Sequence, residues 1–131
     1  MISKLNQPIM KSFTLLLCLS WCMIGFSQNV QIPDANFEKV LIDLNIDSDK
    51  TVNGQILKSD VLLTTQLDVS NKKIKSLKGI EAFETLRFLN CEKNLLTNIN
   101  LSQNIALTTV ITDVNNVVSN DQNNHLFMWI D

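Results

Sequence analysis

Two stretches of the chain carry the same pattern: residues 86–96 read LRFLNCEKNLL and residues 107–117 read LTTVITDVNNV. In each, apolar or small side chains occupy the first, fourth and sixth positions, an asparagine the ninth and an aliphatic residue the eleventh. A weaker copy begins at Thr64, so the three starts are spaced by 22 and then 21 residues. A fixed period of this length indicates a chain built from similar units that stack on one another.

The spacing lies within the range of leucine-rich repeats, whose units are roughly 20–29 residues long. Strand side chains alternate between two faces, so one set in each unit points inward and stacks on the next unit. We therefore predict an α/β fold, a leucine-rich-repeat right-handed solenoid with a short parallel sheet and a helical N-terminal cap. The predicted inward pairs are Leu67 and Val69, Leu89 and Cys91, and Val110 and Thr112.

The outward positions of the same strands form the predicted binding surface, because strand alternation places them together on the concave side. Apolar residues beside charges suit contact with a protein or peptide. A solvated face without a partner is an alternative of similar weight, since three strands about 4.8 Å apart make a small interface. The predicted partner-binding residues are Gln66, Asp68, Ser70, Phe88, Asn90, Glu92, Thr109, Ile111 and Asp113.

Residues 1–27 have the three parts of a secretory signal: a basic start with Lys4 and Lys11, an apolar run over 13–26, and small residues before a cut after Ser27. The run is shorter than the roughly 20 residues that a membrane-spanning helix needs. We expect a cleaved signal peptide, export to the medium or the cell surface, and no membrane span after cleavage.

Cleavage would remove Cys18 and Cys22 and leave Cys91 as the only cysteine, so we expect no internal disulfide. Its place in the repeat predicts a buried packing residue.

Residues 28–63 are predicted to be the helical cap, residues 64–118 about three leucine-rich repeats, and residues 119–131 a C-terminal tail or incomplete cap. Asp34 is a suitable N-cap, and the apolar residues from Phe37 to Leu44 recur at helical spacing. A helix is expected from Asp34 to about Leu44.

The acidic segment that follows tests a calcium-loop hypothesis. Counted from Asp47, the sixth position holds Val52 where the loop needs glycine, and the twelfth holds Lys58 where it needs glutamate. Counted from Asp43, the sixth position holds Ser48 and the twelfth Gly54, so this register does not match the loop either. We therefore expect a solvated turn from Asp47 to Gly54 and no metal site.

Charge and motifs exclude other functions. Without residues 1–27 the chain has nine basic and thirteen acidic residues, which gives no electrostatic reason to bind nucleic acid. No nucleophile–base pair, phosphate loop or metal-ligand spacing is evident, so neither an enzyme nor a cofactor is expected.

Four segments resemble secreted or surface bacterial leucine-rich-repeat proteins with internalin-like repeats. Residues 32–38, IPDANFE, are similar to the opening of that group; LDVSN at 67–71 and LKGIEAF at 77–83 are similar to its first coil; LNCEKN at 89–94 is similar to its repeat core. The resemblance implies an exported protein that recognises an unidentified protein or surface ligand. Members are usually longer, so this chain is expected to be a short or truncated member, or else a vestigial product without binding activity.

Overall fold

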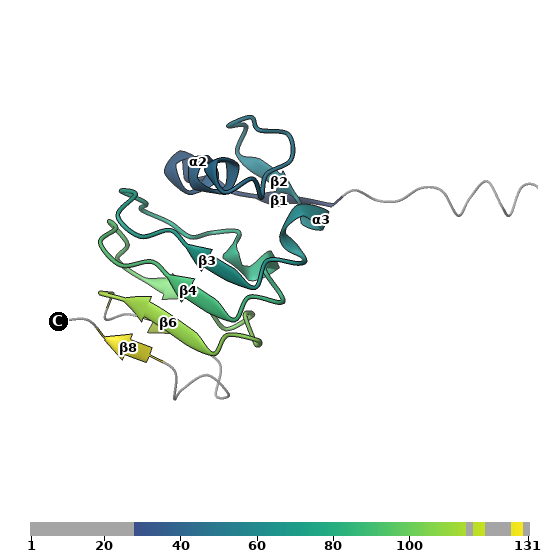
Figure 1. Cartoon of the computed structure of the whole chain (residues 1–131). Helices are drawn as coiled ribbons and strands as arrows, with labels where there is room; N and C mark the ends of the chain where they lie inside the picture. The colour runs from purple at the N-terminus through teal and green to yellow at the C-terminus, as the bar shows by residue number, and fades with distance from the viewer. Residues whose placement is uncertain (1–27, 115–116, 120–126, 130–131) are drawn as a thin grey trace, which may run out of the picture.

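The computed structural model describes residues 28–114, 117–119 and 127–129 of the chain, the last three by their backbone (Figure 1). The predicted signal peptide and Asn115 lie outside these residues.

A four-stranded parallel sheet runs through the repeats, and its strands follow one another in chain order (Figure 1). In the register of the sheet, Leu67 lies opposite Leu89 and Leu89 opposite Val110. The predicted alignment of the three units is therefore confirmed. The strands are β3 (Gln66–Asp68), β4 (Phe88–Asn90), β6 (Thr109–Thr112) and β8 (Phe127–Trp129).

The inner side of this sheet is the core. All six predicted inward residues are buried, each with at most 2% of its surface exposed. Burying an aliphatic side chain of this size contributes roughly 1.5–3 kcal/mol, which makes the stacked rows a main source of stability. Thr112 brings a hydroxyl into this core, and its Oγ1 accepts a hydrogen bond from the Val114 amide at 3.1 Å, so the buried oxygen is satisfied.

Behind the main sheet the chain runs from one strand to the next through shorter elements, and we call residues 69–87 and 91–108 the first and second return segments. The 3₁₀ helix η1 (Ile80–Ala82) lies in the first return segment, and β5 (Ile99–Asn100) pairs in parallel with β7 (Val117–Val118). The side-chain Nδ2 of Asn104 donates to the carbonyl oxygens of Ile80 and Phe83, at 2.7 and 3.2 Å. It thereby joins two successive return segments.

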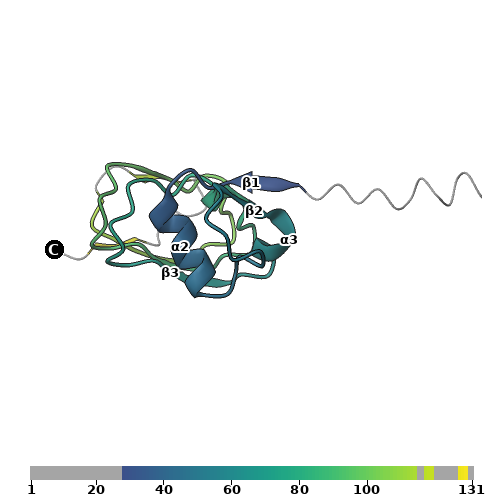
Figure 2. The ribbon, with the colours of Figure 1, turned by 90° about the horizontal axis from the view of Figure 1, so that it is seen from above.

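An N-terminal unit lies beside β3 at one end of the sheet, and α2 lies across the stacked strands when they are seen from above (Figures 1 and 2). It consists of β1 (Asn29–Gln31) paired antiparallel with β2 (Gln55–Leu57), and the helices α2 (Ala35–Asp43) and α3 (Lys58–Val61). The expected helix after Asp34 is confirmed. Its apolar face is buried, and the Phe37 ring lies 6.5 Å from that of Phe83 in the first return segment.

Asp34 joins this unit to the first repeat. Its Oδ1 accepts from the amides of Asn36 and Phe37, which caps α2, while its Oδ2 accepts from the amides of Lys75 and Ser76 at 2.7 and 3.0 Å. One carboxylate thus fixes the helix and the repeat relative to each other.

Gly79 makes a second close contact between the two parts. Its φ of 103° lies in the left-handed region, and a Cβ at this position would overlap the side chain of Ile32 and the carbonyl of Gln31. Only glycine fits this approach without displacing the N-terminal unit.

The segment from Asp47 to Gly54 differs from the solvated turn that we expected. Asp47 is only 1% exposed, because its amide donates to the Leu41 carbonyl and draws the residue against α2. Glu38 of α2 is fully buried, and its carboxylate accepts from the amides of Asn53, Gly54 and Gln55. The loop therefore packs against the buried Glu38 carboxylate and buries its own Asp47. Most of its other residues are exposed.

Within 119–131, the predicted tail, residues 127–129 form β8 beside β6. None of the helices in the described part of the chain is long and apolar enough to cross a membrane.

Candidate binding surface

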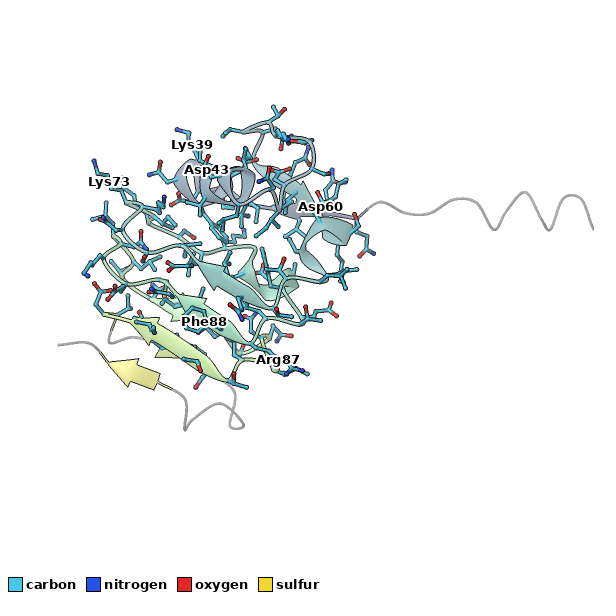
Figure 3. The ribbon with its side chains drawn as sticks, viewed as in Figure 1. Lys39, Asp43, Asp60, Lys73, Arg87 and Phe88 are labelled. Atoms are coloured by element: carbon cyan, nitrogen blue, oxygen red, sulfur yellow. The ribbon has the colours of Figure 1, made fainter. Side chains whose placement is uncertain are left out.

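Six of the nine predicted partner-binding residues belong to strands of the main sheet, on the side opposite the core, and the other three, Ser70, Glu92 and Asp113, follow the ends of these strands; we call this surface the outer sheet face. The register aligns Gln66, Phe88 and Thr109 in one row. It aligns Asp68, Asn90 and Ile111 in the next row, and each of the nine residues is at least partly exposed. Side chains of these strands lie over the sheet in Figure 3, where Phe88 is labelled.

Hydrogen bonds orient the polar groups where the strands end. Asp68 Oδ1 accepts from the Ser70 amide at 3.0 Å, and Asn90 Oδ1 accepts from the Glu92 amide at 3.2 Å. Asn90 Nδ2 also donates across the strands to Asp68 Oδ2 at 3.4 Å. These contacts fix the orientation of the Asp68 and Asn90 side chains.

Asp68 is the best-defined charge on the face. The Ser70 amide is the main cause of a pKa below the ordinary aspartate value; partial burial opposes this shift, and the Ser70 and Asn90 side chains and the nearby Lys72 support it. The carboxylate is therefore ionised at neutral pH.

Two further acidic residues follow the ends of β4 and β6. Glu92 forms an ion pair with Lys93 at 3.3 Å, and Asp113 accepts from the Lys93 amide at 3.0 Å. The Lys93 side chain is 68% exposed, and ion pairs of this kind contribute little free energy, so a basic partner group competes for Glu92 at small cost.

A groove of about 520 Å³ opens between the end of α2 and the first two strands of the main sheet, a size typical of ligand sites. Three predicted residues line it, Gln66, Asp68 and Phe88. Four others were not predicted: Leu44, Ile46, Thr64 and Thr65. Leu44 was assigned to the apolar face of the helix, but it is the C-cap of α2 and 46% of it is exposed.

Another hollow, of about 390 Å³, lies on the return segments, between residues 76–81 and 98–103. Its lining is mostly polar, and none of the nine predicted residues contributes to it. It offers positions for control substitutions away from the outer sheet face.

The described ranges contain no group of three or more histidine, cysteine, aspartate or glutamate residues that could hold a metal ion. Cys91 is buried in the core, as predicted, and burial raises the pKa of its thiol to about 11. Because the thiolate is the reactive form, Cys91 is a packing residue and not a nucleophile.

Comparison with known proteins gives structural similarity only. No family model matches the chain, and no curated protein matches it. Among solved structures, the functional domain of InlJ from Listeria monocytogenes has a TM-score of 0.57 and 27% identity, over 69% of this chain and 21% of that one. An internalin, InlF, from Listeria monocytogenes has a TM-score of 0.55 and 24% identity, over 71% of this chain and 28% of that one.

This chain therefore spans less than a third of either internalin structure. The InlJ domain is described as including a cysteine ladder, whereas the described part of this chain has the single cysteine Cys91. Together with the register of β3, β4 and β6, these similarities support an internalin-like leucine-rich-repeat fold.

Proposed function

We propose that this chain is a non-enzymatic binding module, a secreted or cell-surface leucine-rich-repeat protein that recognises a protein or surface ligand through its outer sheet face. The observation that carries the proposal is the register of the strands, which exposes Phe88 and Ile111 in rows with oriented acidic and amide side chains. Apolar groups with polar neighbours already in position are typical of protein-binding surfaces.

The architecture in this proposal is a right-handed solenoid with the N-terminal unit as its cap. Packing of that unit against the first repeat supports the interpretation, since Ile32, Phe37 and Phe83 are all fully buried where the two meet. Without a cover, the first repeat would expose apolar side chains to water.

The location follows from residues 1–27, which we take to be a cleaved export signal. The charged start, the short apolar run and the small residues Gly25 and Ser27, three positions and one position before the cut, support this. Mass spectrometry of the exported protein is expected to find its first residue at Gln28 or Asn29; an intact N-terminus on the purified extracellular protein would contradict it.

A vestigial product without binding activity is the alternative, and the small outer face favours it. A cross-linking experiment on live cells that produce the protein, and on other cells in the same culture, distinguishes the binding module from the vestigial product. Its variants are Ile111→Asp and Asn90→Arg on the outer sheet face and Gln103→Arg in the hollow of the return segments.

We expect protein partners that cross-link to the wild type and to Gln103→Arg, but about tenfold less to Ile111→Asp and Asn90→Arg. The same partners on all variants, or none above background, would overturn the proposed function. Matching thermal melts of the variants would show that lost binding is not lost folding.

A further inference from the structure

We propose that the groove between the end of α2 and strands β3 and β4 is an anchor site for a peptide segment that presents one apolar side chain and, close to it, a lysine or arginine. The inference rests on the proposed function and specifies the ligand chemistry at one end of the outer sheet face.

The wall of the groove is apolar on two sides. Leu44 and Ile46 come from the N-terminal unit and Phe88 from β4, so two parts of the fold meet around one hollow. All three side chains retain exposed surface, and Leu44 retains nearly half. An aliphatic or aromatic side chain that enters the groove would remove apolar surface from water on both of its sides.

Charge favours a basic ligand. Among the described residues, Asp68 is the only ionisable one that lines the groove, and it is held ionised by its hydrogen bonds. Lys72 acts on this carboxylate electrostatically, but in the part of the chain that the structure describes no lysine or arginine lies within ion-pair distance of it. Asp43, next to Leu44, adds negative charge at the exposed end of α2 (Figure 3). An acidic ligand would be repelled here and a basic one attracted.

The polar rim suits a peptide rather than a free amphiphile. Thr64, Thr65 and Gln66 line the same groove and carry hydroxyl and amide groups that can bind peptide backbone. A lipid or alcohol would use the apolar wall alone and would gain nothing from a basic group.

The test is a two-dimensional amide NMR titration of the isotope-labelled full chain with short synthetic peptides. Each peptide has one leucine among glycines, and a lysine one, two or three positions later. One matched set carries glutamate in place of lysine, and another carries glycine in place of leucine. n-Hexanol serves as the apolar probe without charge.

We expect saturable shifts at the amides of Leu44, Gln66 and Phe88 with a leucine–lysine peptide, at a dissociation constant in the millimolar range. The glutamate and glycine peptides are expected to bind about tenfold more weakly. Leu44→Ser and Asp68→Asn should each weaken binding about fivefold, whereas Leu63→Ser should not. Leu63 is a matched control, because it is 88% exposed and does not line the groove.

Equal binding of lysine and glutamate peptides, or hexanol binding at the same residues with no gain from lysine, would overturn the assignment of a basic ligand. Absence of saturable shifts in the groove up to about 10 mM peptide would overturn the anchor site itself. Neither result decides the proposed function, which the cross-linking of Ile111→Asp tests on β6, two strands away from Asp68.

Discussion

The side-chain amide of Asn94 donates a hydrogen bond to the carbonyl oxygen of Val69, 2.9 Å away in the preceding repeat. The same amide donates to the carbonyls of Cys91 and Glu92, and its Oδ1 accepts from the amides of Lys72 and Ile74 at 3.0 Å. One side chain therefore satisfies backbone groups of two turns and ties adjacent repeats together.

Replacing Asn94 by alanine is expected to lower the free energy of unfolding by about 3 kcal/mol, because several backbone groups lose their partners at once. Urea unfolding followed by circular dichroism measures this. Asn98→Ala is the control: Asn98 is exposed, and its loss is expected to change stability by less than about 0.5 kcal/mol. Equal effects of the two substitutions would contradict the structural role of Asn94.

Asp34 is expected to show two separable contributions. Asp34→Asn keeps a capping oxygen for α2 but loses the carboxylate that accepts from Lys75 and Ser76, at a cost of about 2 kcal/mol. Asp34→Ala loses both and should cost about 3 kcal/mol. Urea midpoints of the three proteins measure the difference, and equal stability of Asp34→Asn and wild type would show that the contact with the repeat contributes nothing.

The contribution of Asp34 also depends on pH. Burial alone would raise the pKa of its carboxyl, but hydrogen bonds from four amides outweigh burial and lower it. A lowered folded-state pKa means that this stabilisation is present above the ordinary aspartate value and is lost as pH falls through the folded-state pKa. The difference between wild type and Asp34→Asn should therefore shrink below about pH 4.

Asp47 is expected to behave in the opposite way. Its Oδ2 is buried without a hydrogen-bond partner. Burial raises the pKa of this carboxyl; a bond from the Asp49 amide opposes the rise, and repulsion by Asp49, Glu38 and Asp60 adds to it. A raised folded-state pKa means that ionised Asp47 destabilises the fold at neutral pH, and that this cost disappears as pH falls towards the ordinary aspartate value.

Asp47→Asn is therefore expected to stabilise the chain at pH 7 by about 1 kcal/mol, with a gain that disappears towards pH 4. Thermal melts across this pH range give the result. Asp43→Asn, at an exposed position on α2, is the control and should show no such trend. A variant less stable than wild type at pH 7 would mean that the Asp47 carboxylate has a favourable partner in solution.

Cys91 is expected to resist alkylation by iodoacetamide at pH 8 and to react once the chain is unfolded in urea. With a pKa of about 11, on the order of 0.1% of the thiol is ionised at that pH, and the side chain is fully buried. Mass spectrometry of the peptide that contains Cys91 reads its modification separately from that of the other cysteines. Equal rates in native and denaturing buffer would contradict the buried position.

Several features were predictable because they depend on short-range patterns. Leu89 and Val110 stand at the same place in two units 21 residues apart, and strand alternation then determines which neighbours point outward. The helix after Asp34 was predictable for the same reason, since a cap and an apolar stripe lie within a dozen residues.

β8 was missed because it breaks the period: Phe127 pairs with Val110 at an offset of 17 residues, against 21 and 22 for the earlier strands. The buried state of Asp47 was missed because acidic residues in a turn usually face solvent, and a contact that buries one has to be known from the structure. Here the contact is with Leu41, through a backbone hydrogen bond that leaves no mark on residue types.

Residue order alone thus predicts the repeat and the two faces of its strands, because a periodic pattern of apolar residues can be buried only in one register. The groove required the folded chain, because Leu44 and Phe88 belong to different units and share no local pattern. Their meeting depends on how the N-terminal unit packs on the first repeat, through Asp34, Ile32 and Gly79, and such packing is a property of three-dimensional fit rather than of sequence spacing.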